Sequence, residues 1–261
     1  MRSSLIGMCS AVALVAVASS AQAAVIASDN GSNYGSGWTN GSNGGFGFGA
    51  WSFNQNGGGY TGAFIGNPEN IGVTGMGSSA FALYANGLSS TAQWSKAARS
   101  FSNPLGIGDS FSLQWGINWA SGGSSGEKGF SLSCTGNPSS PDIMVKNIGE
   151  SASIQVYSVA TGYVDIGFGY GTNAMTWTFT QTTANTVTVT ANDRDGSGLY
   201  TATFAVSGRL SGFELTTSYL YDNNSNREPY YNNFTINSVP APGAAALVGL
   251  AGLLGSRRRR N

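Results

Sequence analysis

Residues 109–119 read Asp-Ser-Phe-Ser-Leu-Gln-Trp-Gly-Ile-Asn-Trp, and every second residue from Phe111 to Trp119 is large and apolar. A period of two places the apolar side chains on one face of an extended strand and the remaining side chains on the other. We therefore expect residues 109–119 to form a β-strand that is buried on one face, with Trp115 and Trp119 both turned toward the core.

The same alternation recurs in other parts of the chain. Four further segments show it, and each is rich in Val, Thr or aromatic residues: 176–181, 186–190, 201–206 and 213–221. Clusters of Gly, Asn, Asp and Ser separate these segments, as they do between strands. Many short strands at regular spacing are typical of a sandwich or barrel. The sequence thus predicts an all-β fold, an antiparallel β-sandwich over residues 45–238.

Residues 24–44 form a lead-in to that domain that is rich in Gly, Ser and Asn. Such composition is typical of flexible linkers. Four aromatic residues recur between positions 46 and 53, whereas disordered segments are usually poor in aromatics. We expect a loose lead-in up to about Gly44 and ordered strands after it.

Cys134 follows Phe130 and Leu132 at every second position, with serines between them. This pattern places the thiol on an apolar face, where a cysteine behaves as a small hydrophobic residue. The other cysteine, Cys9, lies in the N-terminal segment discussed next, so we expect no intramolecular disulfide.

The N-terminus has the three parts of a secretory signal peptide. Met1-Arg2 provides a positive start, residues 5–18 are almost entirely apolar, and Ala21-Gln22-Ala23 is a small-x-small site. We expect residues 1–23 to form a signal helix that signal peptidase removes between Ala23 and Ala24. The remaining chain would then be exported.

The C-terminus also has the character of a targeting segment. It reads Val239-Pro240-Ala241-Pro242-Gly243, then an apolar stretch over residues 244–255, then Arg257-Arg258-Arg259-Arg260. The apolar stretch is shorter than the ~20 residues of a stable membrane span. Arginines favour the cytoplasmic side of a membrane. We expect a short apolar helix that contacts the membrane transiently, and a permanent C-terminal anchor is the alternative.

Residues 239–261 resemble the PEP-CTERM sorting domain of exported proteins in Gram-negative bacteria. One position departs from the family pattern, because Ala241 stands where the family has its central glutamate. The resemblance implies that an exosortase, a membrane-embedded cysteine protease, recognises and removes this tail. It also implies a mature protein at the cell-envelope surface or outside the cell.

The body of the chain resembles a recurrent group of exported bacterial proteins that often carry the same kind of tail. The matching segments are residues 45–66, 80–86, 99–101, 108–113 and 231–236. That group is similar to jelly-roll, concanavalin-like sandwiches. The resemblance therefore implies a fold, but it brings no catalytic residues with it.

The charge of the exported part argues against nucleic acid as a partner. Without Arg2 and the four terminal arginines, seven of the 12 basic residues remain against 12 acidic ones, a net charge of about −5. Nucleic-acid binding requires a basic surface. The sequence predicts no nucleic-acid partner, and a membrane partner only through the tail.

The absence of histidine restricts the available chemistry. It excludes Ser-His-Asp triads, Cys-His pairs and histidine-based zinc sites. Glycosidases instead require two nearby carboxylates, but Glu214 and Asp165 each stand alone in their predicted strands. We predict no catalytic residues and no cofactor, and a glycoside hydrolase is the less favoured alternative.

Asp193 and Asp195 are the one pair of acidic residues with a spacing that calcium loops use. Gly196 comes too early for an EF-hand loop, and no glutamate follows at the twelfth position. An Asp-Gly turn between two strands explains the segment better. We therefore expect a hairpin rather than a metal site.

Carbohydrate binding is the main alternative to a purely structural role, because the flat faces of aromatic side chains offer amphipathic platforms. The candidate side chains are Trp94, Trp115, Trp119, Tyr221, Tyr230 and Tyr231. Tyr230 and Tyr231 are adjacent, so one of them faces away from the core if the segment is extended. We therefore expect an exported, non-catalytic surface or extracellular-matrix protein, or alternatively a carbohydrate-binding module that uses Tyr230 and Tyr231. Exopolysaccharide is the candidate partner.

Overall fold

The computed structural model describes residues 23–35, 37–87, 93–192, 198–220 and 223–239. Residues 24–238 form one compact unit. Most of the predicted signal peptide and sorting tail, including both terminal helices, lies outside the described residues. Only Ala23, Ala24 and Val239 of the residues assigned to those signals are described.

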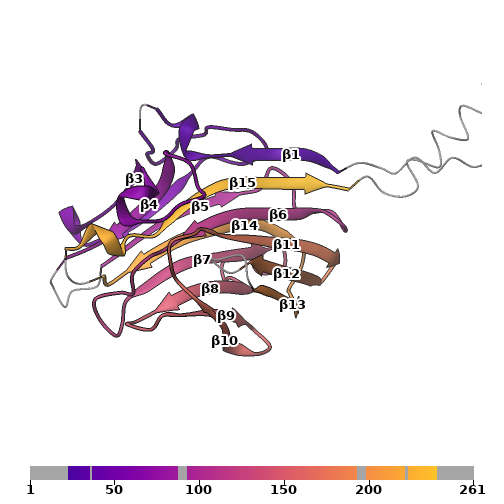
Figure 1. Ribbon diagram of the computed structural model, residues 1–261. Helices are drawn as coiled ribbons and strands as arrows, with labels where there is room; N and C mark the ends of the chain where they lie inside the picture. The colour runs from indigo at the N-terminus through magenta and orange to yellow at the C-terminus, as the bar shows by residue number, and fades with distance from the viewer. Residues whose placement is uncertain (1–22, 36, 88–92, 193–197, 221–222, 240–261) are drawn as a thin grey trace, which may run out of the picture. The chain divides into compact units, whose positions relative to one another are not determined.

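The unit is built from strands in two antiparallel sheets (Figure 1). The eight-stranded sheet has the order β13-β12-β11-β6-β15-β4-β3, and β1 pairs with the C-terminal part of β15. The seven-stranded sheet has the order β10-β9-β8-β7-β14-β5-β2. The strands are β1 (Ala24–Asp29), β2 (Ser52–Asn56), β3 (Thr61–Gly66), β4 (Ala80–Ala85), β5 (Trp94–Ser100), β6 (Ser110–Gly116), β7 (Glu127–Cys134), β8 (Ile143–Ile148), β9 (Ser153–Ser158), β10 (Gly162–Gly169), β11 (Met175–Thr183), β12 (Thr186–Asn192), β13 (Leu199–Ala205), β14 (Leu210–Ser218) and β15 (Tyr230–Ser238).

Short 3-10 helices occur between the strands of the described residues. They are η1 (Gly31–Asn33), η2 (Gly58–Tyr60), η3 (Pro68–Ile71) and η4 (Ser225–Arg227). Among the described residues, no helix is both long enough and apolar enough to cross a membrane.

One apolar core joins the two sheets, which confirms the predicted antiparallel sandwich. Phe111 and Trp115 of β6 and Phe130 of β7 are fully buried in it, although β6 and β7 belong to different sheets. Cys134 also lies in this core, as the alternation of its strand predicts. The sandwich is therefore held together by the inward faces of alternating strands.

The first predicted strand ends earlier than its alternation suggests. β6 stops at Gly116. Trp115 is fully buried, as expected, but Trp119 lies beyond the strand and keeps 45% of its surface exposed. The expectation that Trp119 faces the core is wrong, because the period of two no longer applies once the chain leaves the sheet.

The lead-in is ordered, and the expectation of a loose segment up to Gly44 is wrong. Its first residues form β1, which runs antiparallel to β15 from the Ala24–Ser238 pair to the Asp29–Phe234 pair. Tyr34 and Trp38 are 5% and 3% exposed and belong to the main core. Gly45 adopts a positive φ where the chain crosses β1, and a Cβ there would lie 2.2 Å from the Ser28 carbonyl oxygen.

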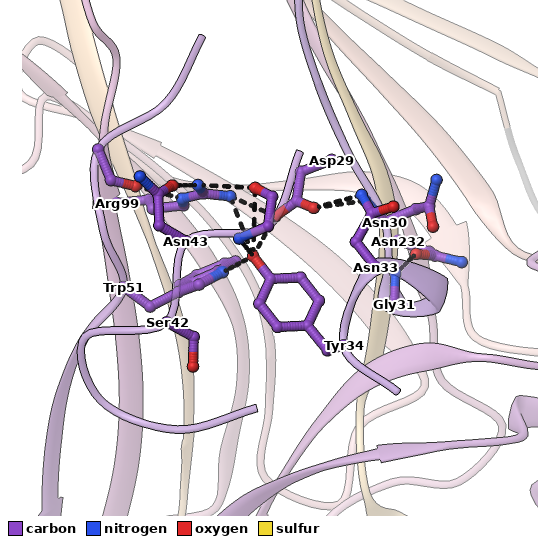
Figure 2. A network of polar contacts seen from close by, with 12 residues as sticks. Asp29, Asn30, Gly31, Asn33, Tyr34, Ser42, Asn43, Trp51, Arg99 and Asn232 are labelled. Atoms are coloured by element: carbon purple, nitrogen blue, oxygen red, sulfur yellow. Dashed lines mark hydrogen bonds and ion pairs between the residues drawn. The ribbon is translucent and has the colours of Figure 1, made fainter. Parts of the chain in front are cut away.

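A buried polar network fixes the lead-in to the sandwich (Figure 2). The Arg99 guanidinium forms an ion pair with Asp29, and both side chains are fully buried. Tyr34 donates to the same carboxylate at 2.7 Å. The Trp51 indole donates to the Tyr34 hydroxyl at 2.9 Å. These partners satisfy a charge that burial would otherwise make costly.

Candidate functional site

An open groove of about 760 Å³ lies on the outward face of the seven-stranded sheet. Its floor comes from four adjacent strands, β5, β14, β7 and β8. We call it the sheet groove. Because side chains alternate along a strand, the outward residues of these four strands face the groove while their neighbours fill the core.

The strand register aligns the floor residues into rows. One row runs from Lys96 through Thr216 and Gly129 to Lys146, one residue from each strand. Small residues thus occupy the middle of the row and long basic side chains its two ends. A depression along the centre of the sheet follows from this order of side-chain sizes.

Each lysine at the end of this row pairs with a glutamate. Lys96 Nζ lies 2.8 Å from Glu214 Oε1, and the two side chains are 37% and 34% exposed. Lys146 Nζ lies 2.6 Å from Glu127 Oε2. Burial disfavours the charged form of Lys146, but the hydrogen bond and charge of Glu127 outweigh it and raise the pKa of Lys146. The floor therefore presents donors and acceptors with little net charge.

Aromatic side chains flank the floor on both sides. Trp94, at the start of β5, lines the groove, and its indole nitrogen donates to Asn54 Oδ1 at 3.4 Å. On the other side, the Tyr163 ring centroid lies 5.1 Å from that of Tyr157 and 6.0 Å from Lys146 Nζ. Tyr163 is 44% exposed. Amphipathic rings therefore stand at both margins of a polar floor.

The two tyrosines expected to bind sugar do not face solvent. Tyr231 is fully buried in the main core, where its hydroxyl donates to the carbonyl oxygens of Gly129 at 2.7 Å and Thr216 at 3.0 Å. Tyr230 is 3% exposed and packs in a second cluster with Ile71 and Met76. The proposal of a platform at these residues is therefore wrong.

Tyr230 is buried because the outward face of β15 is covered, as its inward face is. The two adjacent rings do point to opposite faces of the strand, as the alternation requires. However, η3 and the residues after it pack over the outward side and bury Tyr230 there. Alternation along a strand does not show whether the face away from the core is open to solvent or covered by another segment.

The remaining candidate residues lie in different environments. Trp94 lies in the sheet groove and Trp119 is exposed outside it. Tyr221, Asp193 and Asp195 lie outside the described residues, although β12 and β13 on either side of the expected hairpin do pair antiparallel. Within the described part of the chain, no group of three or more His, Cys, Asp or Glu residues could hold a metal ion.

Sequence reasoning missed the sheet groove because its residues are distant in the chain. Lys96 and Glu214 are 118 residues apart, and Lys146 and Glu127 are 19 apart. The only available signal was the polar half of each alternating strand, such as Ser131 and Ser133 in β7. That pattern indicates an outward face but does not show which strands become neighbours.

No protein-family model matches the sequence, and no curated protein matches it. Among solved structures, a conserved carbohydrate esterase from the Shiga toxin-encoding bacteriophage phi24B is similar at 13% identity and a TM-score of 0.44, over 84% of this chain and 100% of that one. An alginate lyase of polysaccharide lyase family 7 is similar at 12% identity and a TM-score of 0.36, over 72% and 82% of the two chains. The exoplasmic/lumenal domain of VIP36, bound to Ca²⁺ and Man3GlcNAc, is similar at 8% identity and a TM-score of 0.40, over 73% and 84%.

Proposed function

We propose that this chain is an exported, non-catalytic carbohydrate-binding protein that holds a polysaccharide along the sheet groove. The observation that carries the proposal is the groove itself, a polar floor across four strands with aromatic rings at both margins. We also propose a jelly-roll, concanavalin-like topology for the sandwich. The mature protein would reside at the cell-envelope surface or in the extracellular matrix.

The composition of the groove suits a neutral glycan. Sugar rings present apolar faces that pack on aromatic side chains and hydroxyl groups that both donate and accept hydrogen bonds. Trp94 provides such a face, and the Lys96–Glu214 and Lys146–Glu127 pairs provide both donors and acceptors. Because each lysine is matched by a glutamate, the floor has no excess charge that would select an acidic polymer.

The spacing of the groove carboxylates supports binding rather than hydrolysis. Glu127 lies opposite Ser218 on β14, four residues beyond Glu214. Four residues of strand span about 13 Å at a rise of ~3.3 Å per residue. Glycosidases place their two carboxyl groups ~5–9.5 Å apart. Each glutamate is also already paired with a lysine.

Retention on immobilised polysaccharides tests the proposed ligand class. We expect the purified protein to be retained by at least one neutral polysaccharide and less by acidic ones. Trp94→Ala should reduce that retention, because it removes the aromatic margin of the groove. Trp119→Ala is the matched control, since it removes an exposed tryptophan that does not line the groove. Equal retention of the Trp94→Ala variant and the unmodified protein would contradict the proposal.

The proposed export route has a separate test. Signal peptidase and an exosortase-like protease are the proposed partners, and they would remove residues 1–23 and part or all of residues 239–261. The intact mass of the protein recovered from the cell surface or medium measures both losses. Recovery of the complete chain from the cytosol would refute this route without affecting the assignment of the sheet groove.

A further inference from the structure

A second, smaller pocket of about 290 Å³ lies on the other sheet, beside β3 and β4. We call it the edge pocket. Its lining includes Tyr60, Phe64, Tyr84, Asn86, Ser225 and Glu228. Phe64 packs against the second cluster, which contains Tyr230, whereas Phe81 and Leu83 of β4 lie in the main core. The edge pocket and the sheet groove are therefore on outward faces of different sheets.

Aromatic rings form the apolar wall of the edge pocket. A Cβ at Gly62 would lie 2.4 Å from the Tyr84 ring, so this ring lies directly over the glycine. The Phe64 and Tyr84 ring centroids are 6.2 Å apart, with a 52° angle between their planes. Tyr60 also lines the pocket and is 58% exposed. A wall of this kind suits the apolar face of a ligand or a cation above a ring.

Backbone hydrogen bonds hold the segments that form the pocket. The Asn86 N–H donates to the Tyr60 carbonyl oxygen at 2.9 Å, and the Asn223 N–H donates to the Asn86 carbonyl oxygen at 2.9 Å. These bonds connect η2, the end of β4 and the segment before η4. The pocket is thus pre-formed by main-chain contacts.

Two buried acceptors form the polar end of the pocket. Asn86 and Glu228 are each 7% exposed, and Asn86 Nδ2 donates to Glu228 Oε1 at 2.8 Å. The Asn86 Oδ1 atom is buried and has no hydrogen-bond partner among the residues that the structure describes. Among the described residues, Glu228 forms no salt bridge. A buried acceptor without a donor and a buried carboxyl without a cation both cost free energy. A ligand that supplies a hydrogen-bond donor and a positive charge would therefore be favoured.

We infer that the edge pocket binds the primary ammonium group of an amino sugar. A primary ammonium has three N–H donors and one positive charge, which match the free Asn86 oxygen and the Glu228 carboxylate together. A quaternary ammonium has no donor for Asn86, and a neutral hydroxyl has no charge for Glu228. The exposed Tyr60 ring offers a stacking face for the sugar, and Ser225 offers a hydroxyl. This inference does not depend on the sheet groove.

The protonation of Glu228 agrees with this assignment. Burial raises the pKa of Glu228 to about 7, although the hydrogen bond from Asn86 opposes the rise. Among the described residues, Tyr60 and Tyr84 are the other titratable side chains that line the pocket. The pKa of Tyr230 is raised to about 12 by burial and by the charge of Glu228. Arg227, the preceding residue, donates to the Ala120 carbonyl oxygen at 2.6 Å. An arriving ammonium would favour the ionised carboxylate.

The test compares glucosamine with N-acetylglucosamine and glucose, using NMR titration of the purified protein at pH 7. N-acetylglucosamine has lost the charge of the amine, and glucose has no amine. We therefore expect glucosamine to bind about tenfold more tightly than either of these two sugars, which is the effect of one charge-assisted hydrogen bond. Glu228→Gln, which preserves shape, should abolish that preference. Tyr60→Ala, at an exposed position, should weaken glucosamine binding about fivefold.

Two further measurements test whether the edge pocket acts on its own and whether it requires a sugar ring. Trp94→Ala should bind glucosamine normally, which separates the edge pocket from the sheet groove. Nα-acetyl-lysinamide carries the same ammonium without a sugar ring and should bind more weakly than glucosamine. Equal binding of the three sugars would overturn the ammonium assignment, and binding of the lysine probe alone would overturn the amino-sugar assignment.

Discussion

The Arg99 guanidinium and the Asp29 carboxylate form an ion pair in which both side chains are fully excluded from solvent. Arg99 belongs to β5 of the seven-stranded sheet, and Asp29 belongs to β1 of the eight-stranded sheet. The pair therefore links the two sheets. Arg99 also donates to the Gly49 carbonyl oxygen at 2.5 Å and to the Gly44 carbonyl oxygen at 3.1 Å. The bond to Gly44 ties the end of the lead-in to the same point.

Asp29→Ala should strongly destabilise the protein, because it leaves the Arg99 charge buried without a partner. Removal of one member of a buried ion pair typically costs about 3–5 kcal/mol. The change in the free energy of unfolding in urea measures this cost. Lys96→Ala is the control, since its pair with Glu214 is about one-third exposed and such pairs contribute about 0–1 kcal/mol. Similar losses in the two variants would contradict the structural role of the buried pair.

The stability of the ligand-free protein should fall as the pH rises from about 5 to 8. Burial raises the pKa of Glu228 from 4.5 to about 7, so the folded state keeps a proton that the unfolded state has already released. The stabilisation is complete below the unfolded pKa and is lost as the pH passes the folded pKa. The full effect is about 3 kcal/mol, at 1.36 kcal/mol per pKa unit.

Urea denaturation at several pH values measures this slope. Glu228→Gln should flatten it, because glutamine cannot release a proton. Glu150→Gln changes an exposed glutamate and should leave the slope as it is. If Glu228→Gln retained the slope of the unmodified protein, another group would be responsible for it.

The sandwich could be predicted from the sequence because alternation is a local property. Segment 186–190 lies within β12 and segment 176–181 lies within β11, and their apolar residues are buried as the period of two requires. The order of the strands could not be predicted in this way. β7 and β14 are neighbours, yet more than 70 residues separate them.

The order in the lead-in was hidden by its composition. Gly, Ser and Asn usually indicate a flexible segment, but here the burial of Asp29 and Tyr34 depends on Arg99, 70 and 65 residues further along the chain. The edge pocket also depends on residues that are distant in the chain, since Asn86 and Glu228 are 142 residues apart. Contacts over such distances arise from the fold and leave no local pattern.

Cys134 should be unreactive in the folded protein. Burial raises the pKa of its thiol, and the hydrogen bond and charge of Asp142 raise it further. Only the thiolate reacts with alkylating reagents. In a Cys9→Ser variant, where Cys134 is the remaining cysteine, alkylation at pH 8 should be about a hundredfold or more slower in the native protein than in urea. Rapid alkylation of the native protein would show that the thiol is accessible.

Gly129→Ala should separate β7 from β8 and distort the floor of the sheet groove. A Cβ at Gly129 would lie 2.0 Å from the Val145 carbonyl oxygen, which is backbone and cannot rotate away. Overpacking of this kind typically costs about 1–3 kcal/mol. Lys146, which is paired with Gly129 in the register, would move with β8. We therefore expect both a lower free energy of unfolding and weaker retention on the polysaccharide that the groove binds.

Gly35→Ala is the matched control for this prediction, because a Cβ at Gly35 meets no atom within 4 Å. It makes the same chemical change without a close contact and should alter neither stability nor retention. If Gly129→Ala lowered stability but left retention unchanged, the floor of the groove would not be the binding surface. If it behaved like Gly35→Ala in both measurements, the close approach of β7 and β8 at this position would be refuted.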